Sequence, residues 1–579
     1  MKKCGVLFLL IFCANSFAVE GQTAQTSVRS PQQDADIAEA KDLLRQASTL
    51  ASHINLAGSK PGSDTRTTEL VRQIVHAQAM ADDIDGALKT ASVFPEKSGK
   101  PLEQKTIALA LAKAGRVSEA LGISSVSALA TSGIDSIMEA LLKGGYTSSV
   151  FAALTDLPTN EGKIILLARI ARAQTKAGDS AAQQTFQQAL HLATSTIDFA
   201  RIAKAQHEAG DQAAMAKTFQ SATEKILSSK PKIRTPHDKS TVEGLVIIAT
   251  AQAYLGDKTA SEQTLKLALE DASSLYKGET AIGALDLIAQ VQASAGNSRG
   301  STDTFRKCLE LADTLPEDGR WYPLTRIAQD QIYAEQFTAV PETLQRAIQS
   351  VKVSTKSLDV TKNDLEKLKK MRTGVLEAIA LIAAAAGQGE MALDIAESID
   401  LVSTKVKTFS HIVNAVHKVK RMQNPSKVLL RLSRGINRVA DDSGIQDAKD
   451  LINVAVVQAG IDELPLAVAT IEKIREPKSW PDAYNFILRI LIEANNWAGA
   501  RQIADRLPND YYSKPDLLKK LVKRQATTSG VNDMRDWCLR QNAALLQASC
   551  LLGTAEGILE RSEVEVLVEN PLKRFGLAD

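Results

Sequence analysis

The stretch Ile170-Ala171-Arg172-Ala173-Gln174-Thr175-Lys176-Ala177-Gly178-Asp179 decides the fold, because its pattern returns along most of the chain. Each copy has an isoleucine, a small residue directly after it, a glutamine four residues after it, and then a glycine followed by Asp or Asn. Further copies begin at Ile202, Ile248 and Ile288. A unit that returns at this spacing predicts stacked helical hairpins, each of which covers the apolar face of its neighbour.

The isoleucine marks one predicted first helix after another. It stands at positions 74, 107, 137, 170, 202, 248, 288, 327, 379, 412, 452 and 487, mostly at a spacing of ~34 residues. Glycine follows eight residues later at 115, 145, 178, 210, 256, 296, 387 and 460, where we expect it to end the helix in the left-handed conformation. The Asp or Asn at 179, 211, 257 and 297 is expected to cap the second helix.

The predicted second helix also repeats one apolar face, in which a large residue is followed three positions later by a small one. The pairs are Phe219 with Ala222, Leu265 with Ala268, Phe305 with Cys308, and Leu344 with Ala347. This i, i+3 spacing is typical of a packed helix. The recurring glutamine shares the packed face of the first helix, so we expect its amide to satisfy backbone groups between repeats.

Three features resemble the tetratricopeptide family of helical-hairpin repeats. They are the small residue in the first helix, the Gly-Asp turn, and the order small, aromatic, small along the second helix, and they are clearest in 210–222. The chain departs from the family because glutamine replaces its bulky first-helix aromatic and because the closing proline is mostly missing. The resemblance implies an all-α fold. We expect a right-handed α-solenoid of about twelve helix-turn-helix repeats over residues 66–508, with capping helices at both ends.

The segments outside the repeats have different patterns. Residues 1–18 resemble a signal peptide, with Lys2 and Lys3 before an apolar run and Ser16-Phe17-Ala18 at the cleavage site. Residues 19–34 predict a flexible tether, 35–57 an N-terminal helix that acts as a cap, and 509–579 a C-terminal helical cap and tail. Insertions at 228–240 and 351–374 lengthen the spacing, and the second insertion is locally basic.

The signal peptide predicts a periplasmic or secreted protein with no transmembrane segment after cleavage. Lipoprotein anchoring is not expected, because bulky Phe12 precedes Cys13 where a lipobox requires a small residue. Because Lys2 and Lys3 leave with the signal, the 69 basic residues become 67, equal to the 67 acidic residues. A neutral chain of this kind is not expected to bind nucleic acid.

Cys308, Cys538 and Cys550 remain after cleavage, too few for a disulfide framework. Cys308 occupies a small-residue packing position, where we expect an inert thiol. Cys538 and Cys550 lie twelve residues apart in a helical region. We expect two buried free thiols there, and a disulfide between them is the alternative.

The sequence contains none of the common catalytic motifs: no His-Glu-x-x-His pair, no phosphate-binding loop, no Gly-x-Ser-x-Gly elbow and no paired-cysteine knuckle. His411 and His417 are six residues apart, which places them on different sides of a helix and disfavours a shared metal. We therefore expect no catalysis, no cofactor and no metal.

Stacked first helices of a solenoid line a concave groove, whose surface residues would stand two, five and six positions after each isoleucine. The predicted partner-binding residues are Arg172, Lys176, Lys204, His207, Glu208, Tyr254, Gln290, Gln329 and Tyr333. They grade from basic to polar and aromatic, which suits an extended peptide or an acidic segment of a protein partner. The alternative is an ordinary solvated face.

Three functions stay open at this point. The favoured one is a scaffold without catalytic activity that binds another protein. The second is a module that binds a small ligand or a cell-wall fragment through Trp480, Trp497, Tyr511 and Tyr512. The third is an enzyme whose site is assembled from dispersed residues. The sequence does not indicate the identity of the partner, the pathway or the oligomeric state.

Overall fold

The structure is a computed structural model that describes residues 31–54, 65–92, 107–108, 111, 116–124, 141–142, 144–229, 240–273, 278–317, 319–354, 362–442, 445–528, 531 and 533–562. Every element of secondary structure in these ranges is a helix, which confirms the all-α prediction. The predicted signal peptide lies outside the described residues. Within these ranges, no helix combines the length and the apolar character that a membrane-spanning helix needs.

Successive helices pair into hairpins. The first helices are α2 (Thr65–Met80), α9 (Asn160–Lys176), α11 (Thr196–Glu208), α13 (Ser240–Tyr254), α15 (Glu279–Ser294), α17 (Trp321–Tyr333), α19 (Lys362–Ala385), α21 (Val402–Lys418), α23 (Ala448–Gly460) and α25 (Trp480–Glu493). The second helices are α3 (Ile84–Ala91), α10 (Ala182–Leu192), α12 (Gln212–Ser228), α14 (Lys258–Ser273), α16 (Ser298–Asp313), α18 (Val340–Ser354), α20 (Gly389–Glu397), α22 (Pro425–Asp442), α24 (Leu464–Glu472) and α26 (Trp497–Arg506).

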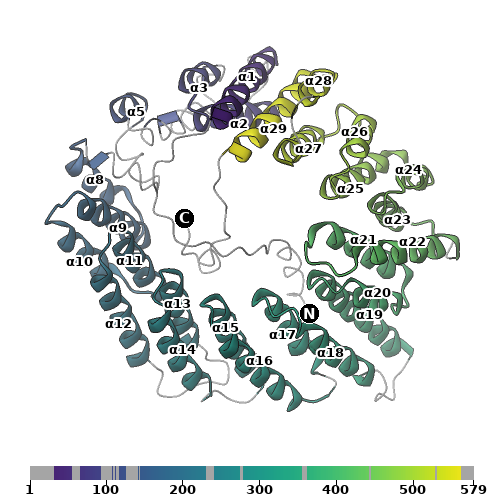
Figure 1. The fold of residues 1–579 in the computed structure, drawn as a ribbon, viewed down its shortest axis with the longest axis horizontal. Coiled ribbons are helices and arrows are strands. Elements are labelled where there is room, and N and C mark those ends of the chain that lie inside the picture. The colour runs from purple at the N-terminus through teal and green to yellow at the C-terminus, as the bar shows by residue number, and fades with distance from the viewer. Residues whose placement is uncertain are drawn as a thin grey trace. The chain divides into compact units, whose positions relative to one another are not determined.

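The described residues form two compact units. The central unit contains residues 219–499, and the terminal unit contains residues 31–218 together with 500–562. Within the central unit each first helix contacts the next, from α13 through α15, α17, α19, α21 and α23 to α25. The hairpins α13–α14, α15–α16 and α17–α18 follow one another in this way (Figure 1). The chain is therefore a stack of helical repeats, as predicted.

The repeated apolar residues form the core between hairpins. Nearly all of the predicted isoleucines and the alanines that follow them are fully buried. The isoleucines are those at 74, 107, 170, 202, 248, 288, 327, 379, 412 and 487, and the alanines those at 108, 171, 203, 249, 289, 328 and 380. Ile137 lies outside the described residues. Ile452 is only half-buried, and Val454 with Ala455 takes the core position instead. The predicted marker at 452 was therefore wrong by two residues.

Between α21 and α22 the left-handed residue is Asn424, twelve positions after Ile412. In the other hairpin turns for which the structure gives a left-handed residue, it stands eight positions after the core isoleucine or valine. Glycine supplies it at 145, 178, 210, 256, 296 and 387, with φ between 73° and 88°, because a glycine has no Cβ to resist this conformation. The predicted Gly460 is instead helical, and Asp462 has the positive φ, consistent with the shift at Val454. Gly115 lies outside the described residues. The predicted caps at Asp211, Asp257 and Asn297 are confirmed, each accepting a backbone N–H of the second helix at 2.8–3.0 Å. The predicted cap at Asp179 was wrong, because Asp179 accepts from the Ala181 N–H in the turn before α10, and Ala181 is the N-cap of that helix.

The recurring glutamine makes a buried hydrogen bond that we call the glutamine clamp. Its side-chain oxygen accepts from a threonine hydroxyl on the second helix of the same hairpin, at 2.7–2.9 Å. The pairs are Gln78–Thr90, Gln174–Thr185, Gln206–Thr218, Gln252–Thr264, Gln292–Thr304, Gln331–Thr343 and Gln458–Thr470. The expectation that this amide satisfies backbone groups between repeats was wrong for its oxygen, which accepts from a threonine within the same hairpin.

The two ends of the described chain pack together in the terminal unit. Helix α1 (Pro31–His53) starts within the predicted tether, and it lies along α29 (Ala544–Ser562), which also packs on α27 (Lys514–Thr528) (Figure 1). A Cβ added at Gly553 of α29 would lie 2.3 Å from the backbone oxygen of Lys519, so α27 and α29 approach as closely as their backbones allow. Arg561 pairs with Asp36 of α1 at 3.1 Å. The predicted closing helices thus cover the N-terminal helix.

Cys538 and Cys550 form a disulfide, with Cα atoms 5.3 Å apart. The expectation of two free thiols was wrong. Cys538 lies on the short helix α28 (Met534–Leu539), and the turn after it folds the chain back onto α29, which brings two cysteines within bonding reach although they are distant in sequence. Cys308 is free and buried, as predicted, and burial raises the pKa of its thiol well above the ordinary value.

Candidate functional site

The predicted groove residues divide between the two units. Arg172, Lys176, Lys204, His207 and Glu208 belong to the terminal unit, and Tyr254, Gln290, Gln329 and Tyr333 belong to the central unit. Each group is a surface of its own unit, built from the faces of successive first helices.

In the terminal unit, Arg172 is not a surface residue. It is only 5% exposed, and its guanidinium on α9 pairs with the carboxylate of Glu208 on the neighbouring α11. The position two residues after the isoleucine lies at the seam between adjacent first helices, so a long side chain there is drawn into the interface. Arg172 therefore joins the helices and does not offer its charge to a partner.

The remaining basic groups of this surface are accessible to different degrees. Lys176 is exposed at the C-terminal end of α9. Lys204 is half-buried, and its Nζ lies 3.9 Å from the carboxylate of Glu208. The ring Nδ1 of His207 lies 3.0 Å from the amide nitrogen of Gln212. Among these residues, Glu208 is shared by Arg172 and Lys204, so one carboxylate stands against three basic side chains.

Of the predicted binding residues in the central unit, two tyrosines are exposed. Tyr254 of α13 and Tyr333 of α17 are 44% and 46% exposed, and they occupy the same position, six residues after the core isoleucine. Gln329 is half-buried, with its amide nitrogen 3.3 Å from the Tyr333 hydroxyl. Gln290 of α15 is buried, so its predicted role as a surface contact was wrong for the same reason as for Arg172.

Helix α15 lies between the two tyrosine-bearing helices and contributes exposed Ser294 at the equivalent position. Packed helices are ~8–10 Å apart, so the two tyrosines are separated by roughly 16–20 Å. An extended chain advances ~3.3–3.6 Å per residue, so five or six residues span this gap. We call Tyr254, Ser294, Gln329 and Tyr333 the tyrosine face.

A polar layer between first helices was missed from the sequence. Lys407 of α21 pairs with Glu377 of α19 at 2.8 Å, and His411 stands one turn further along α21. Burial, and secondarily the charge of Lys407, lowers the pKa of His411. His417 lies on another side of the helix, with its Nε2 2.6 Å from the Gly460 oxygen. Among the described residues, no three His, Cys, Asp or Glu side chains lie close enough to hold a metal ion.

The aromatic residues of the second hypothesis do not gather in one described pocket. Trp480 uses its indole N–H to donate to the Ile474 oxygen at 3.1 Å, which fixes the start of α25. Tyr511 and Tyr512 contact each other with tilted rings whose centres are 5.0 Å apart in the terminal unit, whereas both tryptophans belong to the central unit. In the basic insertion, Lys369 and Lys370 are exposed on α19, and the side chains of 353–368 lie outside the described residues.

No protein-family model and no curated protein sequence matches the chain. Solved structures that are similar to the chain at low identity include the following three. Ton1535 from Thermococcus onnurineus NA1 is 12% identical over 66% of this chain and 97% of its own, with a TM-score of 0.21. Naa15/Naa10 bound to HypK-THB is 14% identical over 82% and 83%, with a TM-score of 0.24. A circular tandem repeat protein is 13% identical over 94% and 99%, with a TM-score of 0.14. Because these scores are low, the fold class rests on the helices themselves.

Proposed function

We propose that the protein is a scaffold without catalytic activity, a divergent relative of the tetratricopeptide repeats, that binds an extended segment of another protein along its first helices. The observation that carries the proposal is the tyrosine face. Aromatic residues are only 4% of the chain, yet Tyr254 and Tyr333 expose nearly half of their surface at equivalent positions of first helices two repeats apart.

Exposed tyrosines favour binding because of their shape and stiffness. A tyrosine offers a large apolar ring and a hydroxyl, and it loses little conformational entropy on binding because it has two side-chain torsions. Tyrosine is accordingly enriched among the residues that dominate protein interfaces. Two rings with Ser294 and Gln329 beside them would receive two side chains of an extended partner and hydrogen-bond the chain between them.

The first-helix face of the terminal unit supports the same function with a different chemistry. Arg172, Lys176 and Lys204 carry three positive charges against the one carboxylate of Glu208, so these four residues have an excess of positive charge. Such a surface steers an acidic segment toward the helices and contributes to the rate of association more than to affinity. We therefore propose that the partner segment for this unit is acidic.

We also propose that the protein works in an oxidising compartment, the periplasm or the cell exterior. The signal-like residues 1–18 and the disulfide between two fully buried cysteines support this location. Disulfides persist in such compartments and are rare where thiols are kept reduced.

Crosslinking capture of the tagged chain from the source cell's envelope fraction tests the function. The charge variant carries Lys176→Glu and Lys204→Glu, and its control carries Lys89→Glu and Lys217→Glu, two exposed lysines on second helices of the same unit. Arg172 stays unchanged, because it is buried and its loss would disturb the contact between α9 and α11. Loss of a specific protein in the charge variant but not in the control supports the proposal.

The tyrosine face is tested separately with Tyr254→Ala and Tyr333→Ala together. The control is Tyr512→Ala, which removes a ring that is 64% exposed on a loop. If the wild type, the double variant and the control capture equal amounts of the partner, the tyrosine face does not bind it. Unchanged capture in both the charge variant and the tyrosine variant refutes binding through first helices.

A further inference from the structure

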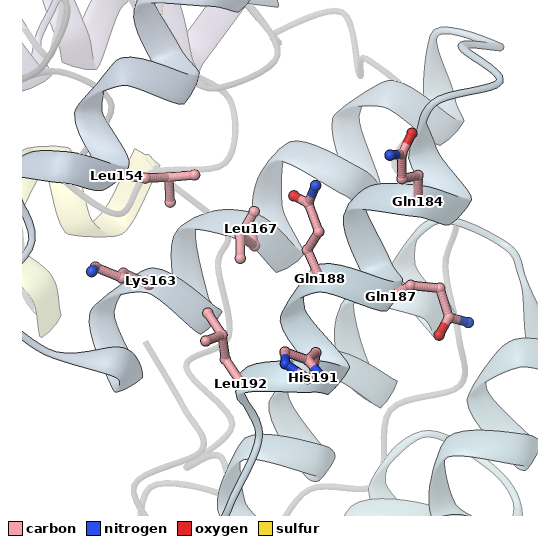
Figure 2. A pocket seen from close by; sticks show the side chains of 8 residues that line it. All are labelled: Leu154, Lys163, Leu167, Gln184, Gln187, Gln188, His191 and Leu192. Atoms are coloured by element: carbon pink, nitrogen blue, oxygen red, sulfur yellow. The ribbon is translucent and has the colours of Figure 1, made fainter.

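An open pocket of ≈490 Å³ lies in the terminal unit, between the η1 segment (Ala153–Asp156), α9 and α10 (Figure 2). Its floor is apolar and consists of Leu154, Leu167 and Leu192. Leu167 is almost fully buried, so the floor belongs to the core of the hairpin. The volume is within the ~300–1,000 Å³ range of ligand sites.

The polar rim of the pocket comes mainly from one helix. Gln184, Gln187, Gln188 and His191 are exposed on α10, and Lys163 extends from α9 on the other side of the leucines (Figure 2). None of these five side chains makes a hydrogen bond or ion pair with another of the residues that the structure describes. In contrast, the clamp glutamine Gln174 of the same hairpin is bonded at both side-chain atoms: its oxygen accepts from Thr185 and its nitrogen donates to Asp179.

The spacing of the rim matches an extended peptide. Gln184 and Gln188 stand four residues apart, ~6.0 Å along the helix, and alternate residues of an extended chain are ~6.6–6.8 Å apart. A glutamine amide has both a donor and an acceptor, the pair that a peptide group requires. The amides of Gln184 and Gln188 therefore reach two successive peptide groups on one edge of a chain.

We propose that this pocket binds an extended peptide that places an aliphatic side chain on the leucine floor and a carboxylate at Lys163. Lys163 is the charged residue of the lining, so the recognised charge is negative. The leucines provide an apolar floor without aromatic rings, which suits a branched aliphatic side chain. A peptide is favoured over a sugar because the rim offers amide groups at the repeat of a backbone.

This site is separate from the first-helix face. Lys163 and Lys176 stand thirteen residues apart on α9, roughly 20 Å along the helix axis. The inference goes beyond the proposed function and does not depend on it. Its failure would leave capture through Lys176 and Lys204 untouched, and the converse also holds.

Fluorescence anisotropy of the full chain with two labelled peptides tests the inference. Both probes are amidated heptapeptides of alternating alanine and leucine on a glycine–serine linker to the dye, one ending in glutamate and the other in lysine. We expect the glutamate probe to bind more tightly. Lys163→Glu should weaken its binding by about tenfold and reverse the preference in favour of the lysine probe.

The glutamine row is tested with Gln184→Ala and Gln188→Ala together, which should weaken binding of both probes by about tenfold. The matched control is Gln183→Ala, which removes an exposed glutamine of α10 that does not line the pocket. Helical content by circular dichroism should be the same in all variants, since these side chains are at the surface.

Several results would overturn the inference. These are no binding of either probe at about 0.1 mM protein, an equal effect of Gln183→Ala, or an unchanged preference in Lys163→Glu. Self-association of the chain that disappears in the Gln184 and Gln188 variant would identify a second copy as the occupant. Competition by neutral oligosaccharides but not by unlabelled peptide would identify a sugar.

Discussion

Thr470→Val tests whether the glutamine clamp stabilises each hairpin. In the wild type, the Thr470 hydroxyl of α24 donates to the side-chain oxygen of Gln458 on α23 at 2.7 Å. Both residues are nearly inaccessible, at 3% and 2% exposure, so no water replaces a lost partner. Valine has the same shape as threonine, and the substitution therefore removes a donor without opening a cavity.

The expected effect follows from the burial. An unsatisfied buried acceptor costs ~1–3 kcal/mol, whereas removal of both polar groups is nearly neutral. Gln458→Met should cost less than Thr470→Val, because the threonine hydroxyl then bonds to its own helix backbone, as threonines in helices commonly do. The double variant Gln458→Met with Thr470→Val should be more stable than Thr470→Val alone.

Amide hydrogen exchange with mass spectrometry measures the stability of each hairpin separately. A separate measurement is needed because long repeat chains open locally and do not unfold in one step. Protection of α23 and α24 should fall by roughly 5- to 150-fold in Thr470→Val. The control is Thr302→Val, an exposed threonine of α16, which should stay within about 0.5 kcal/mol of the wild type. A double variant that is no better than Thr470→Val would refute the reasoning.

Three further outcomes are expected. Gly553→Ala should destabilise α27 and α29 by ~1–3 kcal/mol, because its Cβ meets the Lys519 backbone oxygen, and normal exchange protection of both helices would contradict this contact. Burial lowers the pKa of His411 in the folded state, so the stabilising contribution of its neutral ring is complete above ~6.5 and is lost as the pH falls toward the lowered folded-state pKa. In urea titrations, His411→Gln should therefore lose less stability between pH 7 and pH 5 than the wild type. Replacing Cys538 and Cys550 by serine should lower the free energy of unfolding by ~2–4 kcal/mol, and alkylation of the denatured mature chain without reductant should modify Cys308 alone.

The sequence was sufficient for the fold because the repeat encodes the same contact many times. Each isoleucine, alanine and turn glycine has one role, and errors at single positions do not change the pattern. The sequence prediction placed the core position at Ile452 because that residue is an isoleucine, whereas Val454, two residues later, occupies the position. The clamp would have corrected it, since a threonine twelve residues after Gln458 points to the right register.

The site was less predictable because exposure depends on how closely neighbouring helices pack. Arg172 and Gln290 occupy a position that a hairpin alone would leave at the surface, and the next first helix covers them. The disulfide depends on a reversal of the chain between α28 and α29 that helical periodicity does not reveal. The leucine pocket combines residues from three elements, and no local pattern unites them.

The packing of α1 on α29 has a consequence for synthesis. Helix α1 leaves the ribosome on the order of 500 residues before the helix that covers it, which at ~5–20 residues per second is an interval of roughly 25–100 s. During that interval its leucines have no native neighbour on that side, while the hairpins of the central unit already have theirs. A newly made chain therefore needs protection at its beginning for longer than in its middle, and a chaperone that holds the first helix until the last one arrives would meet that need.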